Sequence, residues 1–323
     1  MQAFEYANPS SLKEALALLG SNWGEVDVLA GGTDQISLMK DYVHTPKRVV
    51  NIKGIQELHG ISKTGQGLRI GAAVTFDELS SNATVRSEYP SIHEAVMGVA
   101  SPQIRNMGTA GGDLCQRPRC WYFRNGFGLL ATKDGKSLVP NGENRYHAIF
   151  GGGPAYFVSA SSLGPALIVL GAHVKLVSSS GSRTVAVEKF FVAPQSDTTR
   201  EIDLKPNEIL TEIVIPGGAK NATYEVRQKE AMDWPLATAS VALHMNGSSV
   251  RSARIVLGHV APTPWPATSA DKALAGKSLS EANVEKAAEE AVAGAQPLSQ
   301  NAYKVQLAKV AVKRALQQAA GKA

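Results

Sequence analysis

The sequence predicts an α+β protein with more than one domain. Helix and strand patterns alternate in the first 80 residues, strand-like runs follow between residues 173 and 257, and helical patterns close the chain. Its 323 residues are too many for one small core and suggest two or three domains of ~100–200 residues each. We therefore expect two N-terminal α+β units, then an antiparallel sheet with helices packed on it.

The first unit opens with a helix. Ser11-x-x-Glu14 has the sequence of a capping box in front of apolar residues at helical spacing, and Gly20 ends that helix. Thr75-x-x-Glu78 caps a later helix in the same way. The strand patterns of this region cover residues 26–30, 48–52 and 68–72. The first boundary is expected near residue 60.

Residues 117–153 are rich in Gly, Asn, Arg and Pro and show little periodicity, so a long loop is expected over residues 114–154. Loops of this length in compact domains are more often functional than idle. The chain's net charge of +5 is concentrated in the same region, between Arg105 and Arg145. The surplus fits either a solvated loop or an anionic ligand. The chain lacks the dense basic blocks of a nucleic-acid binder.

Helical pattern returns at residues 162–170, and strand-like runs follow at 173–177, 209–215, 239–244 and 254–257. These runs suggest the antiparallel sheet. Ser278-x-x-Glu281 is expected to cap an Ala/Glu-rich helix, and residues 303–319 form a second amphipathic helix. The basic side of that second helix, which includes Lys304, is expected to face solvent.

The N-terminus shows neither a basic segment nor an apolar core, so no signal peptide or membrane span is expected. The two cysteines, Cys115 and Cys120, are spaced for neither a zinc knuckle nor a redox pair, which favours a reducing compartment. We expect a cytoplasmic protein, or a periplasmic one only if a partner carries the export signal. The seven histidines show no metal-ligand spacing, so no metal site is expected.

Two glycine-rich turns carry the chemical signal. VLAGGTDQ begins at Val28 and TAGGD begins at Thr109, and each joins adjacent glycines to a hydroxyl and a carboxylate. A diphosphate needs close backbone approach and several N–H groups in one concavity, which glycine permits. Neither turn has the spacing of a Rossmann or Walker motif. Each turn taken singly is also compatible with ordinary loop chemistry.

The ordered motifs together are highly specific and cover nearly the whole chain. VLAGGTD at Val28 and QIRNMGTAGGDLC at Gln103 belong to a set that also includes LRIGA at residue 68, ILTEIVIP at 209, KEAMD at 229 and RIVLG at 254. The sequence thereby resembles the flavin subunit of the xanthine dehydrogenase and carbon monoxide dehydrogenase family. The resemblance implies two α+β subdomains that bind FAD in the manner of vanillyl-alcohol oxidase-type flavoproteins, plus a C-terminal antiparallel sheet with helices. We expect subdomains at 1–60 and 61–177 and a C-terminal α+β domain at 178–323.

The resemblance also implies the cofactor-binding residues. They are Val28, Leu29, Ala30, Gly31, Gly32, Thr33, Asp34, Gln35, Ala100, Thr109, Gly111, Gly112, Asp113 and Leu210. The FAD is expected to be non-covalent, and no catalytic side chain is assigned because the flavin itself carries the redox chemistry. Two departures from relatives, Ser162 in place of an aspartate and Glu225 in place of a lysine, leave the flavin contacts there open.

The implied role is electron transfer within a molybdenum hydroxylase of the aldehyde or xanthine dehydrogenase type. A large subunit would hold the molybdenum cofactor, a small subunit two [2Fe–2S] clusters, and this chain would pass electrons to a small-molecule acceptor. The loop from Cys115 to Arg124 is similar to that of bacterial aldehyde oxidoreductases with an added [4Fe–4S] cluster. Such a cluster needs four thiolates, and only Cys120 matches a ligand position, so no cluster is expected.

Two alternatives stay open at this point. A stand-alone flavin reductase of the same fold would need a proton donor facing the flavin, and the sequence does not identify one. A subunit that has lost FAD and only holds its partners together would not need the glycine turns, which are intact.

Overall fold

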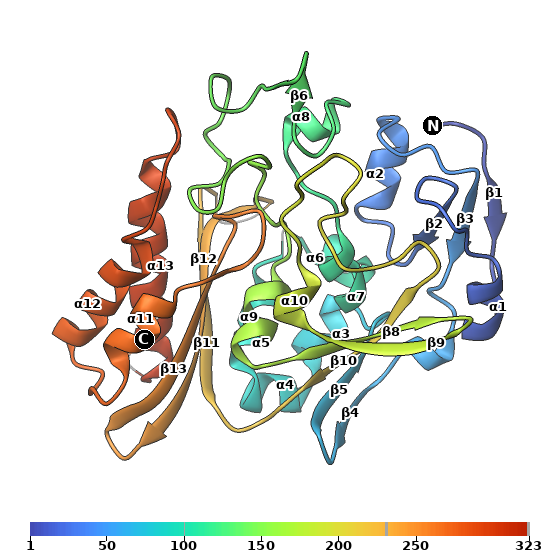
Figure 1. Ribbon diagram of the computed structural model, residues 1–323. Coiled ribbons are helices and arrows are strands. Elements are labelled where there is room, and N and C mark those ends of the chain that lie inside the picture. Colours follow the sequence, from blue (N-terminus) through green and yellow to red (C-terminus); the bar gives the residue numbers. More distant parts are fainter. Residues whose placement is uncertain (100, 230–231, 322–323) are drawn as a thin grey trace.

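The computed structural model describes residues 1–99, 101–229 and 232–321 (Figure 1). The N-terminal unit is a three-stranded parallel sheet in the order β1-β3-β2. Its elements are β1 (Glu5–Ala7), α1 (Leu12–Ala17), β2 (Val26–Leu29), α2 (Gln35–Lys40) and β3 (Arg48–Asn51), and a 3-10 turn at Gln56–Leu58 follows. The predicted strand, glycine turn and helix are therefore β2, the turn at residues 30–34, and α2.

The predicted helix caps are formed to different extents. The Thr75 side chain accepts from the Glu78 N–H, and the Glu78 carboxylate accepts from the Thr75 N–H, so this capping box is complete. At Ser11 only half of the box forms, because the Glu14 carboxylate accepts from the N–H of Ser10 instead. Both residues nevertheless begin a helix where the sequence predicted one.

The middle unit is built on a five-stranded antiparallel sheet in the order β4-β5-β10-β8-β9. Its strands are β4 (Ile61–Thr64), β5 (Gly67–Gly71), β8 (His173–Ser178), β9 (Gly181–Ala186) and β10 (Ile209–Ile215). Strand β10 lies between β5 and β8 and pairs Glu212 with Gly71. Strands β9 and β10 thus belong to this sheet although both lie beyond the expected boundary at residue 177. Glu212 and Gly71 are 141 positions apart in the sequence, so no local signal predicts this pairing.

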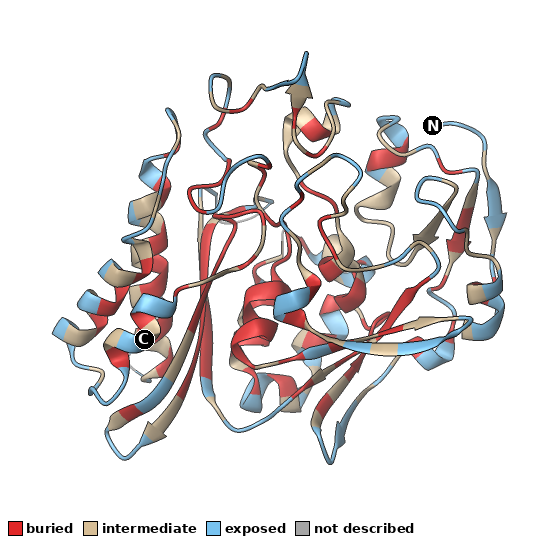
Figure 2. Cartoon of the chain, in the orientation of Figure 1, coloured by how far each residue is buried: buried red, intermediate tan, exposed pale blue. Residues whose placement is uncertain are grey.

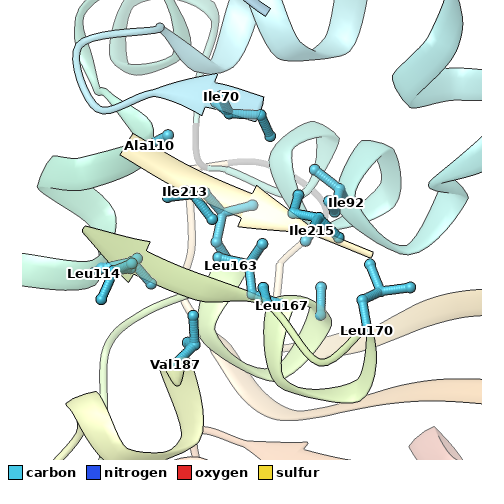
Figure 3. Packing of buried hydrophobic residues seen from close by; sticks show 14 of the residues in the cluster. Ile70, Ile92, Ala110, Leu114, Leu163, Leu167, Leu170, Val187, Ile213 and Ile215 are labelled. Atoms are coloured by element: carbon cyan, nitrogen blue, oxygen red, sulfur yellow. The ribbon is translucent and has the colours of Figure 1, made fainter. Parts of the chain in front are cut away.

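Helices cover one side of the middle sheet and bury its apolar side chains. They are α3 (Phe76–Ser81), α4 (Ala83–Glu88), α5 (Pro90–Met97), α6 (Pro102–Met107), α7 (Ala110–Cys115), α9 (Leu163–Val169) and α10 (Val187–Phe190). Figure 3 shows Leu163 and Leu167 of α9 beside Ile213 and Ile215 of β10. Every residue of α9 is buried. This helix is therefore a fixed support for whatever contacts its N-terminus.

The C-terminal unit is a four-stranded antiparallel sheet in the order β11-β12-β13-β14. Its elements are β11 (Lys220–Arg227), β12 (Pro235–Asn246), β13 (Ser249–Gly258), β14 (Trp265–Pro266), α11 (Thr268–Leu274), α12 (Glu281–Val292) and α13 (Tyr303–Ala319). Helices α11–α13 pack on one face, and α5 and α9 contact the other (Figures 1 and 2). The α12 cap is Ser280, whose side chain accepts from the Asn283 N–H, so the predicted cap at Ser278 is wrong by two residues.

The predicted long loop contains some regular structure. A short helix α8 (Trp121–Arg124) and a two-stranded hairpin of β6 (Thr132–Lys133) and β7 (Lys136–Ser137) lie within it. Lys304 of α13 holds the C-terminal end of this loop, because its Nζ donates to the carbonyls of Tyr146 (3.3 Å) and His147 (3.2 Å). The same Nζ donates to the carbonyl of His259 (2.7 Å), outside the loop. The expectation that Lys304 faces solvent is therefore wrong; its side chain is buried.

No helix within the described ranges combines the length and apolar composition needed to cross a membrane.

Candidate functional site

A cavity of about 400 Å³ lies where the three units meet. The β2–α2 turn, the α6–α7 segment, strand β10 and residues 232–235 contribute to its wall. The predicted site residues that line it are Val28, Ala30, Gly31, Gly32, Thr33, Asp34, Gln35, Thr109, Gly111, Gly112, Asp113 and Leu210. Leu29 packs behind the turn, with its Cδ1 beside Gly32. Ala100 lies outside the described residues.

The first glycine turn contains backbone N–H groups that make no hydrogen bond within the described residues. Gly32 has a φ of +74°, in the left-handed region that favours glycine, and the chain then enters α2. Among the described residues, the four N–H groups from Gly31 to Asp34 donate no hydrogen bond to a protein acceptor. Four successive unpaired N–H groups on a cavity wall make a ready binding place for an anion.

The second glycine turn pairs most of its N–H groups within the protein. Thr109 is the N-cap of α7, and its hydroxyl accepts from the Gly112 N–H at 3.1 Å. The N–H groups of Ala110 and Gly111 donate to the carbonyls of Val74 (2.8 Å) and Ala72 (2.9 Å). Within the described residues only the Thr109 N–H of this turn has no acceptor, so the turn chiefly docks α7 onto the middle unit and presents small residues to the cavity.

The two turns pack directly against each other. A Cβ on Gly31 would lie 1.7 Å from the Met107 carbonyl oxygen, at the end of α6. A Cβ on Gly111 would lie 2.8 Å from the Ala72 Cβ. A side chain at Gly31 would push the two turns apart, and one at Gly111 would push α7 away from Ala72 of the middle unit.

Both carboxylates of the turns are used structurally. Asp34 accepts from the Arg117 N–H at 2.8 Å and from Arg124 Nη2 at 2.7 Å, which ties the first turn to the long loop. Asp113 is buried and accepts from Ser161 and from the N–H groups of Ser162 and Leu163, which caps α9. Burial raises the pKa of Asp113 although these hydrogen bonds oppose the shift.

Sequence reasoning missed one wall of the cavity. Residues Met232 to Pro235 line it, and the Arg119 guanidinium lies over the Trp234 ring at 4.3 Å. Asp233 shapes this segment, since its carboxylate accepts from the N–H groups of Lys229 (2.8 Å) and Trp234 (2.9 Å). Only the KEAMD motif marked the region, and it gave no role to Trp234 or Arg119.

Leu210 and Cys115 line the remaining apolar side. Ile209 and Leu210 of β10 both line the cavity, and the pairing of β10 with β8 shifts register directly after them, between Leu210 and Glu212. Burial raises the pKa of the Cys115 thiol to about 12. At neutral pH that thiol is protonated and unreactive, which agrees with the structural role expected for Cys115.

Ser162 and Glu225, where the sequence departs from its relatives, lie in different positions relative to the cavity. Ser162 is buried and lines the cavity beside Asp113. Glu225 on β11 lies behind the wall, so close to Gly98 that a Cβ there would come within 2.2 Å of its carboxylate. Both Glu225 oxygens are buried without a partner in the described part of the chain, and burial raises the pKa of this carboxyl to about 8.

Cys120 lies outside this cavity. Its Sγ is 3.2 Å from His147 Nε2, and it packs against an apolar cluster that includes Leu129 and Phe157. Within the described ranges, no group of three or more His, Cys, Asp or Glu side chains is arranged to hold a metal ion.

Comparison with known proteins places this geometry in a family. Residues 2–218 match the model of the FAD binding domain in molybdopterin dehydrogenase, and residues 222–319 match the CO dehydrogenase flavoprotein C-terminal domain. The carbon monoxide dehydrogenase medium chain of Hydrogenophaga pseudoflava is 31% identical, over 97% of this chain and 96% of the relative. The aldehyde oxidoreductase FAD-binding subunit PaoB of Escherichia coli (strain K12) is 29% identical, over 96% of each.

A solved structure agrees with these relatives. The Hydrogenophaga pseudoflava carbon monoxide dehydrogenase that lacks the Mo-pyranopterin moiety of its cofactor matches with a TM-score of 0.78 at 30% identity, over 99% of this chain and 98% of that one. The chain therefore belongs to the FAD-binding medium subunits of molybdenum hydroxylases, a family of oxidoreductases. This membership confirms the family resemblance and the α+β fold. It supports the flavin subunit over the scaffold and the stand-alone reductase.

Proposed function

We propose that the 400 Å³ cavity binds one FAD non-covalently, with its diphosphate on the β2–α2 turn. The observation that carries this assignment is the row of unpaired N–H groups from Gly31 to Asp34, which suits a doubly charged anion. The Thr33 hydroxyl adds one more donor beside them. The proposed contacts are Val28, Leu29, Ala30, Gly31, Gly32, Thr33, Asp34, Gln35, Ala100, Thr109, Gly111, Gly112, Asp113 and Leu210.

The second turn contributes to cofactor binding chiefly through the shape that it gives the cavity. Gly111 and Gly112 keep side chains off the cavity floor, while Thr109 and Asp113 fix α7 and α9 around it. Leu210 offers an apolar surface on which a ring can pack. Bound flavin supplies the redox chemistry, and the protein supplies position and electrostatics.

The role that results is electron relay. We assign a large molybdenum-cofactor subunit and a small [2Fe–2S] subunit as partners, from which electrons pass through this chain to a small-molecule acceptor. We place the complex in the cytoplasm. Sheet membership supports a division into residues 1–60, 61–218 and 219–321, which moves the second boundary from residue 177 to residue 218.

The flavin assignment is tested on the purified complex. The visible spectrum should show an oxidised flavin, and acid precipitation should release all of it into the supernatant as FAD. Flavin that stays with the pellet, or FMN in place of FAD, would contradict the proposal. A complex that releases no flavin and cannot be reconstituted with FAD would favour the scaffold role.

We also propose that this chain carries no [4Fe–4S] cluster. Only two cysteines are present, and Cys120 faces His147 and apolar side chains. A cubane with so few thiolates would be labile. Iron analysis and low-temperature EPR on the isolated subunit should show no cluster. About four irons per chain, with a signal lost in Cys120→Ser, would overturn the proposal.

A further inference from the structure

The carboxyl group of Glu225 lies between the C-terminal unit and the middle unit. Strand β11 packs on helix α5, and Glu225 lies on the side of β11 that faces α5, because Tyr224 and Val226 pack into the core on the other side (Figure 1). Both carboxylate oxygens of Glu225 are buried and have no hydrogen-bond partner within the described residues. Asp34 and Asp113 hold structural elements through such bonds, and Glu225 does not.

Glu225 contacts the wall of the cavity that we assign to FAD. The contact is with Gly98, which ends α5 and lines the cavity together with Val99. A Cβ on Gly98 would lie 2.2 Å from Glu225 Oε2 and 2.7 Å from its Cδ, so the carboxyl packs directly against this glycine. A charge on Glu225 therefore acts on the cavity across the backbone of a single glycine.

Two arginines hold the same wall in place. Arg227 Nη1 donates to the Gly98 carbonyl at 2.8 Å, and Arg105 Nη1 donates to the Val99 carbonyl at 3.0 Å. Arg227 is thus engaged by a backbone carbonyl, and the Glu225 oxygens stay unpaired in the described part of the chain. Because the wall is fixed, a change of charge at Glu225 should alter the electrostatic field in the cavity more than its shape.

The charged groups around Glu225, among the residues described, come from three elements. They are Arg227 of β11, Glu94 of α5 and Asp113 of α7. Strand β12 places the neutral Thr238 opposite Glu225. Burial raises the pKa of the Glu225 carboxyl to about 8, Arg227 opposes this shift, and Asp113 adds to it. At neutral pH the carboxyl is therefore mostly protonated and uncharged, as expected for a buried acid without a partner.

We propose that Glu225 is a positioning residue of the flavin site, whose protonated carboxyl keeps the wall at Gly98 free of negative charge. The inference rests on the proposed function for the identity of the ligand. FAD brings a doubly charged diphosphate into the cavity, so an uncharged Glu225 favours binding and an ionised Glu225 opposes it. Bound FAD in turn holds the proton on Glu225 more tightly, so FAD binding near pH 8 takes up a fraction of a proton.

The test is a calorimetric titration of FAD into the flavin-free complex between pH 6.5 and pH 9.5, which does not depend on turnover. The FAD dissociation constant of the parent should rise several-fold over this range, because Glu225 ionises near pH 8. At pH 8, titrations in two buffers of different ionisation enthalpy should show proton uptake on binding. A residue that only fills space would change neither the pH profile nor the proton uptake.

Two variants assign the pH dependence to one carboxyl. Glu225→Gln keeps the shape of the protonated acid and cannot ionise, so its FAD affinity should depend less on pH and its proton uptake at pH 8 should disappear. Glu94→Gln is the matched control. Glu94 is also a buried carboxyl on the interface of α5 with β11, but it accepts from the Thr223 N–H at 2.5 Å and does not line the cavity. This control should keep the pH profile and the proton uptake of the parent.

The outcomes separate this inference from the flavin assignment. Parallel pH profiles for the parent and Glu225→Gln, with FAD bound by both, would overturn the role of Glu225 and leave the flavin assignment standing. Equal loss of the pH dependence in Glu94→Gln would assign it to the interface of α5 with β11 as a whole and would also overturn that role. A folded parent that binds no FAD at any pH would overturn the proposed function together with this inference. Circular dichroism shows whether each protein is folded.

Discussion

The two glycine turns have similar sequences, but their backbone N–H groups differ in how many are paired within the protein. Residues 31–34 leave four successive N–H groups unpaired, whereas the second turn pairs the N–H groups of Ala110, Gly111 and Gly112 with Val74, Ala72 and the Thr109 hydroxyl, and within the described residues only its Thr109 N–H has no partner. Gly32 has a positive φ, and the glycines of the second turn do not. The first turn therefore has the backbone geometry that suits an anion, and the second is a helix cap that packs against it.

The comparison shows what a Gly-Gly pattern does not reveal. Adjacent glycines permit free N–H groups but equally permit close packing of one backbone on another. At Gly111 the close approach is to Ala72, within the protein. The capping residue of the helix at each turn sets the difference, because the Thr109 side chain caps α7 whereas Asp34 makes no cap hydrogen bond to α2.

The largest effect is expected where the turns touch. Gly31→Ala would place a Cβ 1.7 Å from the Met107 carbonyl and should cost about 3 kcal/mol or more of unfolding free energy. It should also abolish FAD binding. Urea unfolding followed by circular dichroism and FAD titration measure both effects.

Two matched glycines control this experiment. Gly54→Ala has no heavy atom within 4 Å of its new Cβ and should be neutral. The Cβ added by Gly112→Ala would contact only the Thr109 hydroxyl, at 2.8 Å. Its loss of unfolding free energy should therefore lie between those of Gly31→Ala and Gly54→Ala. Equal stability of Gly31→Ala and Gly54→Ala would show that the turns are not in contact.

The next largest loss of unfolding free energy is expected when Asp113, the carboxylate of the second turn, is removed. Asp113→Ala leaves the N–H groups of Ser162 and Leu163 unpaired in the core and should cost about 3 kcal/mol. Asp34→Ala should cost less and should chiefly loosen residues 117–124. Hydrogen exchange separates the two, since Asp113→Ala should expose α9 and Asp34→Ala should not.

Glu225 is also a buried carboxyl, but unlike Asp113 it accepts no hydrogen bond from the described residues. The pKa of Glu225 is raised to about 8 by burial, opposed by Arg227 and reinforced by Asp113. The folded state thus holds a proton that the unfolded state releases, so this contribution to stability is complete below pH 4.5 and is lost as the pH rises to 8.

Glu225→Gln should remove that dependence. Between pH 5 and pH 8 the parent should lose on the order of 2 kcal/mol more unfolding free energy than the variant does. Urea unfolding at several pH values, with FAD bound and after its removal, gives the comparison. Parallel pH profiles for the two proteins would mean that Glu225 is paired or solvated.

Much of this fold follows from local sequence signals, and the site only in part. The pattern of residues 303–319 gave α13 in full, and both glycine turns fall on the cavity wall. What local signals missed depends on distant partners. Lys304 is buried because three carbonyls from two other segments meet its Nζ, and β10 is central because β5 and β8 flank it. The Arg119–Trp234 wall likewise joins residues 115 positions apart.

The smallest expected effect separates the turns most directly, because each contains one threonine. The Thr109 hydroxyl caps α7, so Thr109→Val should cost about 1 kcal/mol of unfolding free energy in the flavin-free protein. The Thr33 hydroxyl makes no hydrogen bond within the described residues, so Thr33→Val should leave that stability unchanged and weaken FAD binding several-fold. Urea unfolding of both variants without flavin, followed by FAD titration, gives the two numbers. Loss of stability in Thr33→Val, with full FAD affinity, would assign the first turn to structure as well and remove the distinction between the two turns.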